Sequence, residues 1–74
     1  MYLRGMKLSA RNQLAATVVS VELGAVMSTV VMRLDGGQEV VAAITKDSAE
    51  GLELAAGDSV IAVIKSTEVM VAKD

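Results

Sequence analysis

The strongest constraint on the fold is that two short segments are apolar on both faces of the strands that they predict. Residues 40–44 and residues 60–64 hold only aliphatic side chains, at odd and even positions alike. Successive side chains of a strand point to opposite faces, so a half-solvated sheet would alternate apolar with polar residues. We therefore expect one face of these strands to line a core and the other to pack against a second subunit.

The size and composition of the chain also favour an oligomer. A chain of 74 residues is a single domain that buries a low fraction of its surface. Its apolar content is 53%, yet Tyr2 is its only aromatic residue, so the core is built from small aliphatic side chains. It has no Cys to form a disulfide or a thiolate metal site. The surplus aliphatic surface predicts a homo-oligomer.

Three strands are expected in the first half of the chain. Residues 14–23 are rich in β-branched side chains and end in clear alternation, and residues 28–34 resume that alternation after Gly24-Ala25. Asp35-Gly36-Gly37 is a tight-turn signal between two alternating runs. Residues 38–45 should therefore fold back as the third strand of a hairpin.

The second half predicts one short helix and two further strands. Residues 46–54 lose the strand pattern and suit one or two helical turns that start at an Asx or Ser cap. Gly57-Asp58 marks the next turn, and residues 59–65 and 67–72 alternate as strands four and five. The predicted fold class is all-β: a small five-stranded antiparallel OB-like barrel with one short helix between strands three and four.

Several function classes are poorly supported by the residues available. Without His or Cys the commonest general bases and nucleophiles are missing, which argues against an enzyme. The net charge of −2 and the single aromatic residue argue against nucleic-acid binding. Residues 1–5 are too short and polar for a signal peptide, and no apolar run approaches the roughly 18 residues of a membrane span. We expect a soluble, cytoplasmic protein with no membrane partner.

Two clusters of hydrogen-bond donors stand at opposite ends of the chain. Ser9-Ala10-Arg11-Asn12 precedes the first strand, and Lys65-Ser66-Thr67 follows the apolar run of residues 60–64. A tetrahedral dianion accepts hydrogen bonds at every oxygen, and charged donors bind it most strongly. A site of donors only would favour fully deprotonated molybdate, tungstate or sulfate over phosphate, which carries a proton. Each cluster taken alone is more often a solvated loop or turn than a binding site.

Five sequence blocks together resemble the molbindin, or Mop, family. They recur in the family's order and spacing at residues 9–14, 21–26, 44–48, 54–58 and 62–70. The similarity runs from about residue 6 to residue 73. It divides the chain into an N-terminal extension, residues 1–5, and a Mop or TOBE-type domain, residues 6–74.

The resemblance implies a hexamer, built as a trimer of dimers, with sites between subunits for molybdate or tungstate. By position, four residues match the family's principal anion ligands: Ser9, Arg11, Lys65 and Ser66. Thr45 matches a hydroxyl contributor, and Ala10 and Asn12 match backbone or amide contacts.

The function implied by this resemblance is intracellular binding, storage and homeostasis of molybdate or tungstate, without catalysis. Two alternatives remain: a regulatory or docking subunit for a molybdate importer, and binding of the molybdenum-pterin cofactor. A flat heterocycle such as a pterin is usually held by stacking on an aromatic or Arg face. The near absence of aromatic residues therefore favours the inorganic anion over the pterin.

Overall fold

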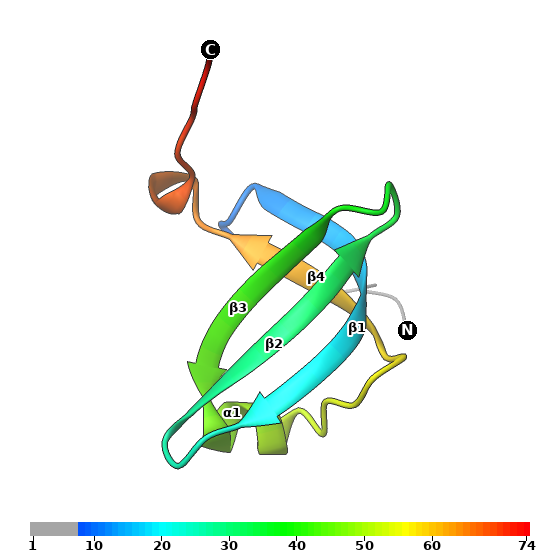
Figure 1. Cartoon of the computed structure of the whole chain (residues 1–74). Coiled ribbons are helices and arrows are strands. Elements are labelled where there is room, and N and C mark those ends of the chain that lie inside the picture. Colours follow the sequence, from blue (N-terminus) through cyan, green and yellow to red (C-terminus); the bar gives the residue numbers. More distant parts are fainter. Residues whose placement is uncertain (1–7) are drawn as a thin grey trace.

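The computed structural model describes residues 8–74, so the expected N-terminal extension, residues 1–5, lies outside the described residues. The described residues form one antiparallel sheet in the order β3-β2-β1-β4, with one α-helix. Figure 1 shows that the sheet is strongly curled. The elements are β1 (Asn12–Leu23), β2 (Met27–Leu34), β3 (Glu39–Thr45), α1 (Lys46–Gly51), β4 (Ser59–Ile64) and the 3₁₀ turn η1 (Ser66–Glu68).

The long strand β1 organises the sheet because it pairs with a different neighbour along each half. Its first half pairs with β4, from Asn12 opposite Ile64 to Thr17 opposite Ser59. Its second half pairs with β2 as far as Leu23, and the register shifts between Val18 and Ser20. A bulge of this kind bends a strand and increases its twist. The bend in β1 lets a single sheet curl toward a barrel.

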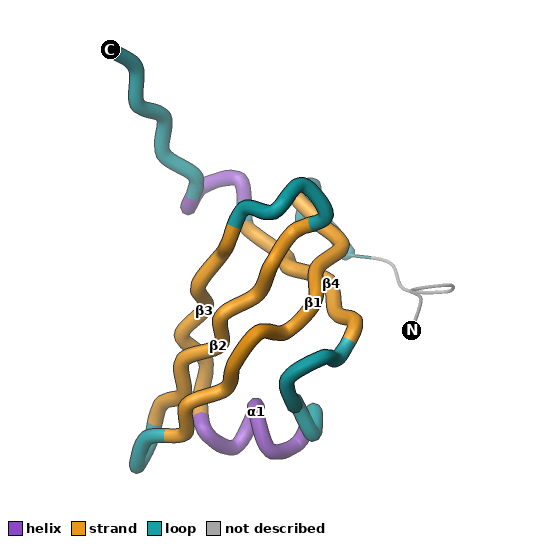
Figure 2. Tube along the Cα trace, turned by 45° about the vertical axis from the view of Figure 1, so that its right-hand side comes forward, coloured by secondary structure: helices purple, strands orange, loops and turns teal. Residues whose placement is uncertain are grey.

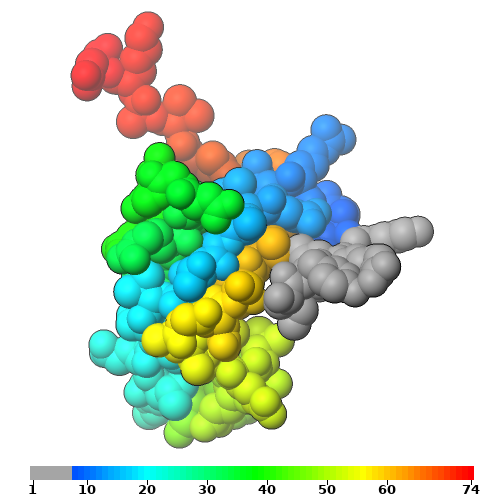
Figure 3. Space-filling view, turned by 90° about the vertical axis from the view of Figure 1, so that its right-hand side faces the viewer, coloured from blue at the N-terminus to red at the C-terminus, as the bar shows by residue number. Residues whose placement is uncertain are grey.

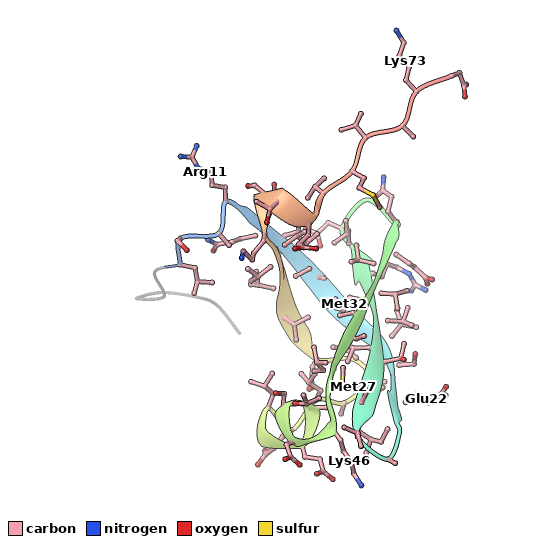
Figure 4. All side chains as sticks on the ribbon, turned by 90° about the vertical axis from the view of Figure 1, so that its left-hand side faces the viewer. Arg11, Glu22, Met27, Met32, Lys46 and Lys73 are labelled. Atoms are coloured by element: carbon pink, nitrogen blue, oxygen red, sulfur yellow. The ribbon has the colours of Figure 1, made fainter. Side chains whose placement is uncertain are left out.

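The core is small and aliphatic, as the composition predicted. Its buried residues come from β1, β2 and β4: Ala16, Val18, Val30, Met32 and Ala62. On β3, Val40, Ala42 and Ile44 are partly buried and pack against this cluster. Met32 lies at the centre of the body in Figure 4. The alternating patterns of β2 and β3 therefore point one set of side chains inward, as expected from the period of two.

The predicted helix of one or two turns between the third and fourth strands is confirmed, but its cap differs from the expected one. It ends at Gly51, and its N-cap is Thr45, whose Oγ1 accepts a hydrogen bond from the backbone N–H of Ser48 at 3.0 Å. The expected Asx or Ser cap is wrong because β3 runs directly into α1, which leaves its last residue at the cap. Ala49 is buried on the inner side of the helix. Figure 2 shows α1 linking the end of β3 to the loop that leads into β4.

The predicted fifth strand is wrong for the described chain. Residues 67–72 do not pair with any strand among residues 8–74. Instead η1 turns the chain away from the sheet, with the Glu68 N–H donating to the Lys65 carbonyl at 2.9 Å. Figures 1 and 3 show the C-terminal segment, residues 69–74, standing away from the body. Alternation alone marks a segment that suits a sheet, but a strand also needs a neighbouring backbone with which to pair.

The departure of the C-terminal segment leaves the barrel incomplete. Val69, Met70 and Val71 are 51%, 92% and 93% exposed. A hollow of about 310 Å³ is lined by aliphatic residues of β3 and β4 together with Leu52, Leu54 and core residues of β1 and β2. β3 and β4 are the edge strands of the sheet, and no strand among residues 8–74 pairs with the outer edge of either one. One copy therefore presents both an unfilled apolar hollow and an unburied apolar segment.

The outer faces of the doubly apolar strands are also uncovered in one chain. Val41 on β3 is 64% exposed and Val63 on β4 is 45% exposed. The expectation that these faces pack against a second subunit therefore stays a prediction. No helix among residues 8–74 is long and apolar enough to cross a membrane.

The buried hydroxyl of Ser28 allows the packing of the described sheet to be tested by mutation. Ser28 is 1% exposed, and its Oγ has no hydrogen-bond partner within residues 8–74. An unsatisfied buried hydroxyl costs about 1–3 kcal/mol, whereas alanine places no polar atom there. We expect Ser28→Ala to raise the free energy of unfolding by about 1 kcal/mol, measured by urea denaturation followed by circular dichroism. A loss of stability would instead mean that the hydroxyl is hydrogen-bonded in solution.

Candidate anion site

The two donor clusters lie side by side at one end of the sheet, although more than 50 residues separate them in the chain. Arg11 directly precedes β1, and Lys65 and Ser66 directly follow β4. Asn12 is paired with Ile64 across the two strands, so the residues just outside that pair are neighbours. The described chain therefore brings Arg11 and Lys65 together within one subunit, which the sequence left open.

Two side-chain carboxamides tie this end of the sheet together. The Asn12 Nδ2 donates to the Ile64 carbonyl at 3.2 Å and so joins the start of β1 to the end of β4. The Gln13 Nε2 donates to the Ala10 carbonyl at 2.7 Å and folds back over the preceding loop. Sequence reasoning missed Gln13. The only feature of the sequence that pointed to this contact was that Gln13 lies three residues after Ala10.

The basic side chains of the two clusters are exposed and form no salt bridge with any of the described residues 8–74. Arg11 and Lys65 are both exposed, and Figure 4 shows the Arg11 side chain extending outward. Within residues 8–74 the salt bridge is the one between Arg33 and Glu39, at 3.2 Å. No group of three or more His, Cys, Asp or Glu residues gathers in the described part of the chain. The chemistry offered at this end is therefore that of hydrogen-bond donors with two positive charges.

Of the other predicted ligands, Ser9 and Ala10 belong to this end and Thr45 does not. Ser9 is exposed and Ala10 is half-buried in the loop before β1. Thr45 ends β3 at the other end of the sheet, where it pairs with Met27. In Figure 4, Arg11 and Lys46, the residue after Thr45, mark the two opposite ends of the body.

The Thr45 hydroxyl already has partners within its own chain. It donates to Ser48 Oγ at 2.7 Å and accepts from the Ser48 N–H at 3.0 Å. Because Thr45 lies at the opposite end of the sheet from Arg11 and Lys65, it could contribute to their cluster only from a second copy of the chain. Its predicted role as a ligand remains a prediction.

Comparison with known proteins identifies close relatives. The family model described as the TOBE domain matches residues 8–71. The molybdenum transport protein ModE of Azotobacter vinelandii is 50% identical over 70 residues, covering 95% of this chain and 26% of ModE. The chain thus spans about a quarter of the length of the ModE relatives. Molybdenum-pterin-binding protein 3 of Clostridium pasteurianum is 47% identical over 66 residues, covering 89% of this chain and 97% of the relative.

Solved structures agree with the sequence comparison. A molybdate-binding protein from Sporomusa ovata superposes with a TM-score of 0.86 at 50% identity, covering 92% of this chain and all of the other. The cytoplasmic molybdate-binding protein ModG, solved with molybdate bound, gives a TM-score of 0.81 at 43% identity and covers 88% of this chain and 46% of ModG. These matches confirm the predicted OB-like fold class.

Proposed function

The chain belongs to the TOBE domain family, as the Mop-type resemblance of its sequence predicted, and on this premise we propose that it binds and stores molybdate or tungstate. The observation that carries the proposal is the pair of donor clusters that β1 and β4 bring together. Arg11 and Lys65 both stand there without a salt bridge among the described residues. The proposed activity is reversible binding of an oxyanion, with no catalytic step.

The chemistry of the donors supports a fully deprotonated tetrahedral anion. Arg11 and Lys65 supply charge, and hydrogen bonds from charged donors are about twice as strong as neutral ones. Ser9 and Ser66 supply hydroxyl donors, and the loop at Ala10 supplies backbone N–H groups. Molybdate and tungstate carry no proton near neutral pH and so require only donors. Sulfate has the same protonation state, so we propose that its smaller size is what excludes it.

We further propose that the binding form is a homo-oligomer, a hexamer built as a trimer of dimers, in which Thr45 of one copy reaches the donor clusters of another. The outward aliphatic faces at Val41 and Val63 support such an assembly, because a monomer would leave them in water. The placement of Thr45 far from Arg11 within one chain supports a site shared between copies.

The C-terminal segment supports a specific dimer contact. Its exposed residues Val69, Met70 and Val71 match the aliphatic hollow between β3 and β4 in character. The outer edges of β3 and β4 are unpaired in the described chain and offer backbone groups to an incoming strand. We propose that this segment of one copy lies against the hollow of its neighbour, so that the predicted fifth strand forms between chains.

The two alternative functions, pterin binding and docking to an importer, are less well supported. The name of the Clostridium relative includes a pterin, but residues 8–74 contain no aromatic side chain on which a pterin could stack. No feature of the described residues separately favours docking to an importer. We propose a cytoplasmic location, which the description of ModG as a cytoplasmic protein supports.

Calorimetric titration of the purified protein tests the proposed function directly. Molybdate, tungstate and sulfate would each be titrated at an oligomeric state measured on the same sample. We expect saturable heat for molybdate and tungstate, with much weaker binding of sulfate. An absence of molybdate binding at micromolar protein would refute the proposal.

A further inference from the structure

This inference rests on the proposed function and concerns the backbone acceptors within the donor clusters. Ala10 lies between Ser9 and Arg11, and Ile64 directly precedes Lys65. Each of these two residues carries a carbonyl oxygen, which is a hydrogen-bond acceptor with a partial negative charge. A free carbonyl directed at a dianion would repel it. The same carbonyl would accept a hydrogen bond from an anion that carries a proton.

Both carbonyls are occupied by side chains at the start of β1. Gln13 Nε2 donates to the Ala10 carbonyl at 2.7 Å, and Asn12 Nδ2 donates to the Ile64 carbonyl at 3.2 Å. Each donor cluster thus has one carbonyl that is hydrogen-bonded by a side-chain carboxamide. The bond from Gln13 closes a turn of four residues, whereas the bond from Asn12 joins residues 52 apart.

We propose that Gln13 and Asn12 are positioning residues that set the specificity of the anion site by occupying these two carbonyl oxygens. The two backbone carbonyls beside Arg11 and Lys65 are then already hydrogen-bonded, and the hydroxyls of Ser9 and Ser66 can each turn an O–H toward the anion. The site then favours molybdate and tungstate over phosphate, because only side-chain oxygens or an already engaged carbonyl can accept the phosphate proton.

A purely structural role predicts a different result. β1 and β4 are already joined by six residue pairs, from Asn12 opposite Ile64 to Thr17 opposite Ser59. Gln13 is exposed, so its side chain contributes little to the packing of the fold. If these hydrogen bonds only hold the fold together, their loss would weaken the binding of every anion equally and would leave the ratio of the affinities unchanged.

The test measures molybdate and inorganic phosphate binding to the full chain at one pH. Gln13→Met keeps the length of the side chain but removes its N–H donors. We expect the ratio of the phosphate Kd to the molybdate Kd to fall about tenfold, as the loss of one hydrogen bond at the site implies. Gln13→Lys keeps a donor for the Ala10 carbonyl and should retain the discrimination of the unaltered protein. Gln38→Met, the same substitution in the turn between β2 and β3, is the matched control.

The outcomes separate this inference from the proposed function. If the unaltered protein binds no molybdate, the proposed function fails. If it binds molybdate and Gln13→Met leaves the ratio unchanged, only the positioning role of Gln13 is refuted. Asn12→Leu, checked for folding by thermal melting, is expected to lower the ratio in the same way, and an unchanged ratio in the folded variant would refute the role of Asn12.

Discussion

Replacing Arg11 and Lys65 together by alanine is expected to weaken molybdate binding at least about a hundredfold. Each hydrogen bond from a charged donor contributes about 1.5–3 kcal/mol, and about 1.4 kcal/mol corresponds to a tenfold change in affinity. Both side chains are exposed, and neither forms a salt bridge within residues 8–74, so their removal should leave the fold intact. Calorimetric titration of the double variant measures the loss.

A matched control separates loss of the site from loss of positive charge. Arg33→Ala combined with Lys73→Ala removes the same two residue types away from the donor clusters. Arg33 lies on β2, where it pairs with Glu39, and Lys73 lies in the C-terminal segment. This control should bind molybdate with nearly the affinity of the unaltered protein. Equal losses in both double variants would mean that net charge, and not the assigned site, governs binding.

Ending the chain after Glu68 is expected to break the proposed dimer contact and so to lower the mass of the oligomer. The truncation removes Val69, Met70 and Val71, which are exposed in one copy and which we propose to be buried against another. A fully buried apolar side chain contributes about 1.5–3 kcal/mol, so these three residues supply much of the proposed contact. Size-exclusion chromatography with light scattering measures the mass before and after truncation.

Two controls define what the truncation removes. Ending the chain after Ala72 deletes only Lys73 and Asp74, and should leave the mass of the oligomer unchanged. Met70→Asp keeps the full length of the segment but places a charge between Val69 and Val71, and should lower the mass of the oligomer as the truncation does. If the chain that ends at Glu68 keeps the mass of the full-length oligomer, the C-terminal segment is not the dimer contact.

Features set by neighbours in the chain were predictable from the sequence. The hairpin turn at Asp35-Gly36-Gly37 formed as expected, with Gly37 at a φ of 95° that favours glycine. The turn at Gly57-Asp58 also formed, with Gly57 at a φ of 93°. The periods of β2 and β3 and the place of the short helix depend on short-range preferences of the same kind. Local chemistry determines such features, so they can be read without knowing the rest of the fold.

The residues of the candidate site could be proposed from the sequence, but their arrangement could not. Ser9, Arg11, Lys65 and Ser66 were identified by chemistry and by resemblance, but the sequence could not say whether Arg11 and Lys65 meet in one subunit. That answer depends on the pairing of Asn12 with Ile64, a contact between residues 52 positions apart. The role of Gln13 was hidden for the same reason, because the carbonyl it binds matters only once the loop has been placed beside β4.

The sequence by itself determined an aliphatic, all-β chain with too much apolar surface for one core and two basic donor clusters. The tertiary structure decided that β1 bends and pairs with both β2 and β4, and that the pairing of Asn12 with Ile64 brings the clusters together. It placed Thr45 away from them at the N-cap of α1. It also decided that residues 69–74 find no partner strand in the described chain. Alternation tells which side chains would share a face. Pairing depends on where a distant backbone lies, and only the folded chain specifies that.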